Sequence, residues 1–574
     1  MRHHIGMKTI GSIVILLGAI SSLYAENYPY QIQIEINNYL NTTTQVKTKR
    51  CTNSHSKIPA WVSEFYLKRR FFPAWIDEIG LKSEAFLLLS KIRAFAKDGY
   101  SQAVYPIKVI DQLSTDAVFM SSQGNSLAPD KAARLDIELS TAFFLHSLFL
   151  SRGRLETPYF EGIYQPLKLP SDLPDELEHA LEAETFDILL AGLAPPQENY
   201  QKLVSAKKRY EAIVTAGGWA KIPKGVTLKA GRQDDRVMLL RKRLILTGDL
   251  TDPSFKNSDY FDDALRKAVQ HFQKRFGLNP DGIVGTSTLD ELNVSAKDRL
   301  TQIVINLERW RQMPHDFGER YIEVNIPDFS LKVVDQGKVV QTMRVIVGRK
   351  DRPTPTFIGR MTYLELNPYW TVPPKIAKKD ILPKIQSDPS FLVRKQIRVF
   401  ENWKATAAEL DPFSIDWNTL SDKNFPYRLR QEPAIDNALG QIKFMFPNKL
   451  NVYLHDTPSK KLFLRRQRNF SHGCVRVENP FELAAYLLNA DANWNPQRLR
   501  HILDDESNRP KVILLKKPIP IYLLYWTTWV EDEGSVSFRN DIYGYDQALL
   551  ELLKEQPPVF RTCLNDSKIA YLSN

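Results

Sequence analysis

Cysteine is scarce in this sequence. Its 574 residues include only three, Cys51, Cys474 and Cys563. Three cysteines cannot all pair within one chain, and we expect Cys51 and Cys563 either to pair with each other or to stay buried, leaving Cys474 single. No second cysteine lies near Cys474, and His472 is too close for the usual ligand spacing, so the pattern does not favour a zinc site. We expect neither a metal nor a cofactor.

Long apolar runs are absent beyond the start of the chain, so no further membrane span is expected. Met7-Lys8 is followed by TIGSIVILLGAISSLYA, which combines a basic start, an apolar run and small residues before a candidate cleavage site after Ala25. This is typical of a secretory signal. The run is short for a span, which needs about 20 residues, although an uncleaved inner-membrane anchor is the alternative. We expect the rest of the chain to be exported and soluble.

Extended runs of one charge are also lacking. The chain has 77 Lys and Arg against 66 Asp and Glu, a net charge of +11, with basic residues spread among acidic ones. A basic surface can attract nucleic acid, membrane or an anionic polymer. The even spread instead favours a soluble protein with a modest excess of charge, and we expect no nucleic-acid partner.

An apolar content of 43% and an aromatic content of 11% are those of a globular chain, and the length suggests two to four domains. The patterns predict a multidomain α+β protein. The predicted parts are a signal peptide at 1–25, a helical scaffold at 26–220, a three-helix unit at 221–296, a linker helix at 297–320, a mainly β unit at 321–516 with a lid insertion at about 376–430, and C-terminal strands and a helix at 517–574.

Periodicity supports these assignments. Residues 84–100 and 135–155 carry apolar residues at helical spacing. From 321 the chain alternates and is rich in valine and isoleucine, and Asp335-Gln336-Gly337 predicts a hairpin turn. Residues 376–430 look polar and irregular, and a segment of this length between two strands is typical of a lid or a subdomain.

The three-helix unit carries two apolar stripes. Val237, Leu240 and Leu244 share one helical face. The second stripe repeats at spacings of three and four and comprises Phe261, Leu265, Val269, Phe272 and Phe276. VTLKAG, followed by AVQHFQKRFGLNPDGIVGTSTL, resembles the peptidoglycan-binding domain of cell-wall enzymes, although Arg241 stands where glutamine is usual. The resemblance implies wall binding; the alternative is that these helices only space the other domains apart.

Chemistry concentrates around Cys474. NVYLHDTP ends a predicted strand at His455, and FSHGCVRV (470–477) follows. Cysteine attacks as the thiolate, and its ordinary pKa of about 8.5 means that it needs a base at neutral pH. His455 is the candidate base, able to take the proton and return it to a leaving amine. Gly473 allows close backbone packing, so the Gly473 and Cys474 amides are candidate donors to a developing oxyanion.

The roles of the neighbouring residues stay open at this point. His472 either orients the turn or lines the oxyanion pocket, or is itself the base. Arg476 either holds a substrate carboxylate or makes a structural hydrogen bond to loop carbonyls. Asp456 orients His455 only if its side chain points inward, since a backbone carbonyl can do the same work.

HDTP followed by SHGCVRV resembles the active-site signature of the L,D-transpeptidases with a YkuD-type catalytic domain. VGRKDRPTPTF (347–357) and NPYWTVPP (367–374) resemble other recurring strings of that family. The order of the predicted domains is similar to that of its large, YcbB-like Gram-negative members. The resemblance is strong over about 220–516 and looser before that.

The resemblance implies a specific reaction. These enzymes attack the carbonyl of meso-diaminopimelate in a tetrapeptide stem, release D-alanine, and hold the tripeptide as a thioester. A diaminopimelate amine then takes the acyl group, forming a 3→3 cross-link, although some relatives attach a lipoprotein or another amine. By position, Cys474 is the nucleophile and His455 the base. The implied oxyanion and substrate-binding residues are Gly473, His472, Arg476, Tyr453, Ser471, Tyr369 and Trp370.

The resemblance also implies a periplasmic protein of cell-wall biogenesis and cell shape, with stem peptides as partners. Whether a glycosyltransferase-bearing synthase or a D,D-carboxypeptidase supplies the tetrapeptides stays open. One alternative function is an L,D-carboxypeptidase or amidase that uses water as acceptor. Another is a wall-binding protein with a degenerate catalytic fold, which the intact Cys474 and His455 disfavour. A papain-like protease would place its cysteine before its histidine, and here the order is reversed.

Overall fold

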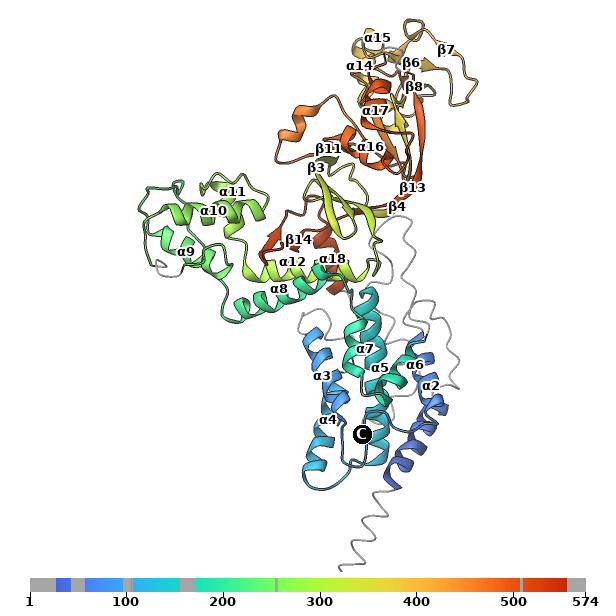
Figure 1. The fold of residues 1–574 in the computed structure, drawn as a ribbon. Helices are drawn as coiled ribbons and strands as arrows, with labels where there is room; N and C mark the ends of the chain where they lie inside the picture. Colours follow the sequence, from blue (N-terminus) through green and yellow to red (C-terminus); the bar gives the residue numbers. More distant parts are fainter. Residues whose placement is uncertain are drawn as a thin grey trace, which may run out of the picture.

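A computed structural model describes residues 27–42, 57–96, 105, 107–154, 172–252, 257–505 and 509–554. The predicted signal peptide at 1–25 lies outside these residues, as do Cys51 and Cys563, whose pairing therefore stays a prediction. Within the described ranges, no helix combines the length and the apolar character that crossing a bilayer requires. The predicted multidomain α+β class is confirmed: a helical region, a small helical unit and a β-rich unit follow one another along the chain (Figure 1).

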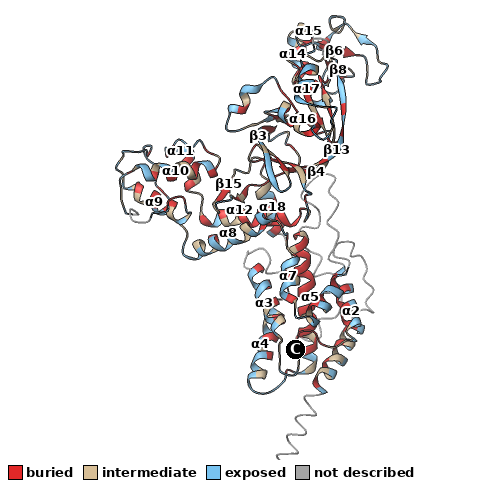
Figure 2. Cartoon of the chain, viewed as in Figure 1, coloured by how far each residue is buried: buried red, intermediate tan, exposed pale blue. Residues whose placement is uncertain are grey.

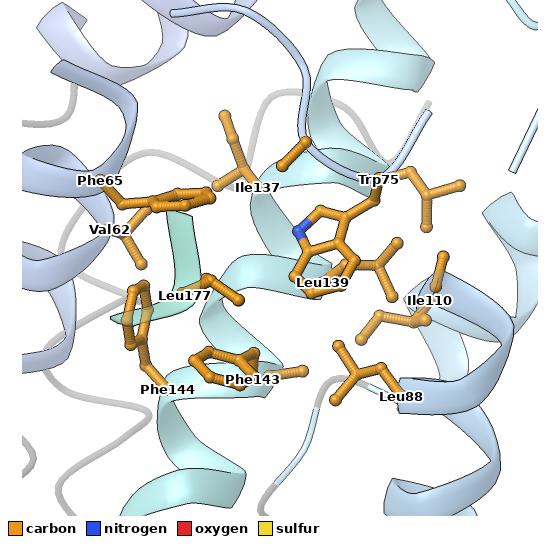
Figure 3. Packing of buried hydrophobic residues seen from close by; sticks show 14 of the residues in the cluster. Val62, Phe65, Trp75, Leu88, Ile110, Ile137, Leu139, Phe143, Phe144 and Leu177 are labelled. Atoms are coloured by element: carbon orange, nitrogen blue, oxygen red, sulfur yellow. The ribbon is translucent and has the colours of Figure 1, made fainter. Parts of the chain in front are cut away.

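The N-terminal region packs helices around α5, which is buried along most of its length (Figure 2). Aromatic side chains fill this core: Phe143 and Phe144 of α5 contact Trp75 and Phe65 (Figure 3). The predicted helix at 135–155 is α5, which begins earlier and ends at Arg152. The helices are residues 27–42, α2 (Ile58–Lys68), α3 (Ser83–Ala96), α4 (Ile107–Ser122), α5 (Pro129–Arg152), α6 (Leu173–Glu182) and α7 (Phe186–Gly192).

The predicted three-helix unit is present as α9 (Arg236–Leu246), α10 (Asp263–Arg275) and α11 (Thr286–Leu292). Both predicted apolar stripes are buried in its core. Arg241, the departure from the usual glutamine, is buried and donates to Asp262 Oδ2 at 2.7 Å. Asp262 also accepts the Leu265 amide at 2.8 Å and so caps α10. Arg241 therefore connects α9 to the N-terminal end of α10 by a hydrogen-bonded ion pair.

The predicted linker helix is in fact a central, buried element. α12 (Ala296–Arg311) packs against α8 (Glu198–Thr215), α5 and the C-terminal segment. Its last turns bury apolar and polar side chains alike, so every face has a neighbour. α8, which we assigned to the scaffold at 26–220, shares its core with the three-helix unit and α12. By its packing, α8 therefore connects the scaffold to the three-helix unit and α12.

The β-rich unit is one nine-stranded sheet within the described residues, in the order β11-β3-β12-β10-β9-β4-β13-β1-β2. The sheet closes on itself because β2 pairs with both β1 and β3. Gln336 and Gly337 have φ of 49° and 72° and form the predicted hairpin turn. The strands are β1 (Arg320–Asn325), β2 (Ser330–Asp335), β3 (Lys338–Gly348), β4 (Phe357–Leu366), β9 (Ile442–Met445), β10 (Leu454–His455), β11 (Asn469–Ser471), β12 (Val475–Val477) and β13 (Lys511–Leu524).

The insertion is a folded subdomain, as predicted, and it is more regular than its polar sequence suggested. It has its own four-stranded sheet, in the order β5-β8-β6-β7, and its own apolar core. Its elements are β5 (Trp370–Thr371), α13 (Pro374–Ile376), η2 (Ala377–Ile381), α14 (Leu382–Ser387), α15 (Ser390–Arg394), β6 (Ile397–Phe400), β7 (Glu409–Leu410), η3 (Pro412–Ser414), η4 (Trp417–Thr419) and β8 (Arg428–Gln431).

The boundary predicted at 516/517 falls inside β13. Ile521 pairs with Ile322 of β1 on one side and with Gly359 of β4 on the other, so the second half of β13 lies inside the nine-stranded sheet. The C-terminal segment then returns to pack on α12. The remaining elements are η5 (Lys460–Leu464), α16 (Pro480–Leu488), α17 (Pro496–Leu503), β14 (Thr528–Val530), β15 (Val536–Phe538) and α18 (Tyr545–Lys554).

A truncation tests this correction. Ending the chain after Lys516 would remove the part of β13 that pairs with β1 and with residues 357–361 of β4. Buried backbone groups that lose their hydrogen-bond partners cost free energy. We expect the shortened protein to lose its cooperative thermal unfolding transition, followed by circular dichroism and tryptophan fluorescence. A chain ended after Lys554 should keep the transition. An unchanged transition in the shorter protein would show that the second half of β13 does not stabilise the sheet.

Candidate active site

A short parallel pairing positions the site. Leu454 pairs with Val475, and His455 pairs with Arg476, where β10 lies beside β12. Alternate residues of a strand share a face, and paired residues on neighbouring strands point the same way. Tyr453 and His455 therefore lie on the same face as Cys474 and Arg476. The Tyr453 and His455 rings meet edge to face, with centroids 5.7 Å apart, so the sheet register gathers side chains from two sequence motifs.

The Cys474 thiol is half-buried and directed at the backbone. Its Sγ lies 3.8 Å from the Asn451 carbonyl oxygen, which accepts the S–H. Burial raises the pKa of the Cys474 thiol above its ordinary value. Hydrogen bonds from the Tyr453 amide and hydroxyl, and the charges of Lys443 and Arg476, oppose this rise in pKa without reversing it. The resting thiol is thus protonated at neutral pH.

His455 is buried in a defined tautomer. Its Nδ1 lies 2.5 Å from the Asp456 carbonyl oxygen, and because a carbonyl can only accept, Nδ1 carries the proton. Nε2 is then the unprotonated nitrogen, as a general base requires. Burial lowers the pKa of His455 to about 3, helped by the charges of Arg476 and Lys443. The imidazole is therefore neutral at pH 7.

The Asp456 side chain does not orient His455. Its carboxylate instead accepts the amides of Thr457 and Gln441, at 2.6 and 3.0 Å, and pairs with Lys460. The backbone carbonyl of Asp456 holds the imidazole, which settles the choice that the sequence left open. Gly440 packs against this carboxylate so closely that a Cβ there would lie 2.4 Å from Asp456 Cγ.

Residues 471–474 form what we call the cysteine turn, between β11 and β12. Ser471 Oγ accepts the Gly473 amide at 3.1 Å and donates to the Cys474 carbonyl at 2.5 Å. Gly473 has φ of +117°, a conformation that favours glycine. Ser471 thus braces the turn, and the Gly473 amide that we predicted as an oxyanion donor is engaged by Ser471 here.

His472 faces the insertion. Its Nε2 lies 3.5 Å from Asp380 Oδ2 of η2, and Asp380 also pairs with Arg352 at 2.5 Å. Burial lowers the pKa of His472, and Asp380 opposes this. Burial would raise the pKa of Asp380, yet Arg352 and His472 together hold it below its ordinary value. Of the three roles left open for His472, this geometry favours orienting the turn.

Arg476 has no ionic partner in the described part of the chain. No carboxylate there lies within ion-pair distance of its guanidinium, and its Nε is buried without a hydrogen-bond partner. The hydrogen bonds to loop carbonyls that we considered do not occur among the described residues. An uncompensated cation beside Cys474 is suited to an anionic group of a bound molecule.

A cavity of about 540 Å³ adjoins the cysteine turn. Its walls come from Pro353, Pro355, Thr356, Leu450, Val452, His472, Gly473 and Tyr545. Tyr369 instead lines a separate cavity between the insertion and residues 509–510. Arg430 lies over the Tyr369 ring at 4.3 Å, and Trp370 packs on the insertion core. The structure therefore does not bring Tyr369 and Trp370 to the cavity beside the cysteine turn.

Sequence reasoning missed several residues of this site. Thr354 lies inside a quoted motif, VGRKDRPTPTF, but nothing in its spacing marks its hydroxyl as special. Asp380 and Lys443 belong to segments without a motif, and Tyr545 lies in the C-terminal segment. A search for charged residues in the insertion could have flagged Asp380, but its partners become visible only in three dimensions.

The electrostatics predict how the thiol responds to pH. We expect alkylation of Cys474 by iodoacetamide to accelerate up to and beyond pH 8.5, the ordinary thiol pKa, because burial raises the pKa of the thiol. Mass spectrometry of the peptide containing Cys474 measures this rate. His455→Asn should leave the profile nearly unchanged, since a neutral imidazole adds no charge. A neutral-pH plateau that disappears in His455→Asn would instead reveal a thiolate–imidazolium pair.

The Asp380 contacts predict a link between insertion and turn. Asp380→Asn removes the charge shared by Arg352 and His472, and a partly exposed pair of this kind contributes up to about 1 kcal/mol. We expect amide hydrogen exchange over residues 377–381 to quicken by roughly fivefold. Asp388→Asn is the matched control, because Asp388 pairs with Arg394 inside the insertion at 2.7 Å. Equal rates of amide exchange over residues 377–381 in both variants would show that the Asp380 contacts do not couple the insertion to the cysteine turn.

Known proteins resemble this chain in the same regions. Residues 319–508 match the family described as "L,D-transpeptidase catalytic domain", residues 233–292 that described as "Putative peptidoglycan binding domain", and residues 60–206 that described as "Scaffold domain". A "Putative L,D-transpeptidase" of Haemophilus influenzae is 37% identical over 256 residues, covering 44% of this chain. The alignment spans 50% of that relative's length.

Solved structures give a weaker likeness. An L,D-transpeptidase from Mycobacterium smegmatis aligns over 36% of this chain and 58% of its own, with 14% identity and a TM-score of 0.17. One from Xylanimonas cellulosilytica aligns over 53% of this chain and 99% of its own, with 16% identity and a TM-score of 0.16. Superpositions this weak carry no argument about function. The family matches therefore show that residues 319–508 are similar to the YkuD-type L,D-transpeptidase catalytic domain and residues 233–292 to the peptidoglycan-binding domain.

Proposed function

We propose that this protein is a peptidoglycan L,D-transpeptidase that forms 3→3 cross-links through a thioester on Cys474. The observation that carries the proposal is the pairing of β10 with β12, which places the Cys474 thiol on one sheet face with a neutral His455. The tautomer of His455 leaves Nε2 able to accept a proton. A thiol and an unprotonated imidazole held in this way are suited to acyl transfer.

The first step transfers a proton and an acyl group. His455 Nε2 takes the Cys474 proton as the sulfur attacks the meso-diaminopimelate carbonyl of a tetrapeptide stem. The resulting oxyanion accepts a hydrogen bond from the Cys474 amide. The bond to D-alanine then breaks, and the imidazolium returns its proton to the leaving amine. The tripeptide remains on Cys474 as a thioester.

The second step regenerates the enzyme. The diaminopimelate amine of another stem attacks the thioester, giving up a proton to His455, and the new amide is the 3→3 cross-link. His455 then returns the proton to the sulfur. The acceptor competes with water for the thioester, so exclusion of water matters. The insertion, tied to the cysteine turn through Asp380 and His472, supports a covering role for this subdomain.

The positive charge of Arg476 is suited to an anionic stem peptide. Arg476 has no ionic partner within the described residues and lies near the thiol. We propose that it receives a carboxylate of the donor stem. The peptidoglycan-binding domain would hold the enzyme on the wall, outside the cytoplasm, and we propose the periplasm as its location. A synthase and a D,D-carboxypeptidase are the proposed sources of its tetrapeptide substrates.

Product analysis tests the reaction. Disaccharide-tetrapeptide is incubated with wild type, Cys474→Ala and His455→Asn, and the products are separated by mass. We expect a tetrapeptide–tripeptide dimer from wild type, none from Cys474→Ala, and a rate about 10²–10⁴-fold lower from His455→Asn, as for loss of a general base. Thermal unfolding of each variant checks that the fold is intact.

Two outcomes would contradict this function. Tripeptide and free D-alanine without dimer would make the enzyme an L,D-carboxypeptidase. A wild type that binds wall sacculi but yields neither product would make it a wall-binding protein.

A further inference from the structure

Three of the four backbone groups at the Gly473–Cys474 step of the cysteine turn are already engaged. Ser471 Oγ accepts a hydrogen bond from the Gly473 amide and donates one to the Cys474 carbonyl. Thr354 Oγ1 donates to the Gly473 carbonyl at 2.8 Å. Among these groups, the Cys474 N–H alone makes no hydrogen bond to any residue that the structure describes. It is therefore the amide available to a developing oxyanion.

The hydrogen bond from Thr354 controls where that amide points. The Gly473 carbonyl and the Cys474 N–H belong to the same planar, trans peptide group, so they point in opposite directions. Holding the carbonyl oxygen therefore fixes the direction of the N–H. An oxyanion donor works only when it is aimed in advance at the position the oxygen will occupy.

Thr354 is well suited to hold this peptide. Its side chain is fully buried, with 0% exposure. Its Oγ1 accepts the Gly348 amide at 2.8 Å and donates to the Gly473 carbonyl, so the direction of both hydrogen bonds is determined. The hydroxyl is thus committed on both sides and cannot rotate away without leaving two buried groups unpaired.

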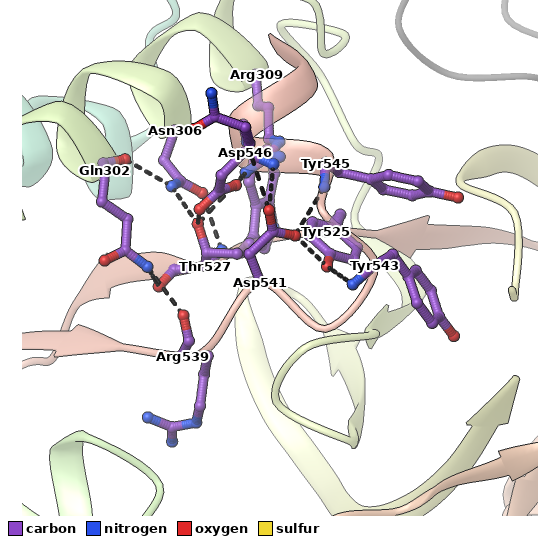
Figure 4. Close-up of polar contacts among 12 residues, drawn as sticks. Gln302, Asn306, Arg309, Tyr525, Thr527, Arg539, Asp541, Tyr543, Tyr545 and Asp546 are labelled. Carbon is purple, nitrogen blue, oxygen red and sulfur yellow. Dashed lines mark hydrogen bonds and ion pairs between the residues drawn. The ribbon is translucent and has the colours of Figure 1, made fainter. Parts of the chain in front are cut away.

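Tyr543, from the C-terminal segment, holds Thr354 in place by hydrogen bonds. Tyr543 Oη donates to the Gly348 carbonyl at 2.7 Å and accepts the Thr354 amide at 3.2 Å. The Tyr543 amide donates to Tyr525 Oη at 2.9 Å, and Tyr525 Oη donates to Asp541 at 2.6 Å (Figure 4). A continuous set of hydrogen bonds therefore leads from the C-terminal segment to the cysteine turn.

We propose that Thr354 is a positioning residue for acyl transfer: it aims the Cys474 amide at the oxyanion, and Tyr543 holds it in place. This role rests on the proposed function, because an oxyanion forms only if Cys474 attacks a carbonyl. It acts on the acyl-transfer steps and not on the thiol itself. Alkylation of Cys474 by iodoacetamide passes through no oxyanion, so the two reactions separate this role from simple damage to the turn.

The test compares Thr354→Val with Thr354→Ser. Valine keeps the shape but removes both hydrogen bonds, whereas serine retains the hydroxyl. We expect Thr354→Val to lower kcat for dimer formation by up to about 10²-fold, the scale of an ångström-sized misplacement, with little change in KM. Thr354→Ser should restore most of the rate. Cys474 alkylation should proceed at the wild-type rate in both variants.

Thr528→Val controls for the loss of a buried threonine hydroxyl. Thr528 is also fully buried, and its hydroxyl donates to the Ser537 carbonyl at 2.7 Å, in the hairpin of β14 and β15. The Thr528→Val variant should have a lower thermal stability than wild type but the same kcat. Tyr543→Phe provides a second variant should Thr354→Val fail to fold; it should lower kcat in the same direction and leave alkylation unchanged.

The outcomes separate this role from the proposed function. An active wild type with equal kcat in Thr354→Val and Thr354→Ser would overturn the positioning role alone. Equal losses in acyl transfer and in alkylation would also overturn it, because they would show general damage to the turn. A wild type that forms no dimer and no thioester would overturn the proposed function and this role with it.

Discussion

The site depends on the parallel pairing of β10 with β12. Leu454 opposite Val475 and His455 opposite Arg476 determine which side chains share a face. A shift of one residue in this register would send Cys474 and His455 to opposite faces. The register is secured because both strands lie inside a closed sheet, with β9 beside β10 and β3 beside β12, and because the Asp456 carbonyl holds the imidazole.

Burial dominates the electrostatics of this site. It raises the pKa of Cys474 against the opposing charges of Lys443 and Arg476, and together with those charges it lowers the pKa of His455 to about 3. The pair therefore rests neutral, and in the proposed mechanism charge separates only when the sulfur attacks. A neutral thiol resists unwanted electrophiles, while the tautomer of His455 keeps a base in readiness. The insertion contacts the same turn through His472 and Asp380.

Much of this could be predicted from the sequence because the relevant patterns are local. Helical periodicity located α3, α5 and the three-helix unit. The motif NVYLHDTP contains Tyr453 and His455, and the motif FSHGCVRV contains Cys474. What the sequence could not reveal comes from segments far apart in the chain. Thr354 and Asp380 contact the cysteine turn directly, and Tyr543 reaches it through Thr354. The helix α12 looked like a linker because its partners, α5, α8, β14 and α18, lie elsewhere in the chain. Tyr369 lines a cavity away from the cysteine turn because the insertion folds around a core of its own.

Peptide mapping of an acyl-enzyme tests the central claim most directly. Wild-type protein is mixed with disaccharide-tetrapeptide, quenched in acid within seconds, digested and analysed by mass spectrometry. The account predicts that the peptide containing Cys474 gains the mass of the disaccharide-tripeptide acyl group and loses it when an acceptor amine is added. An acyl group on any other residue, or dimer formed while Cys474 stays unmodified at every time point, would contradict it.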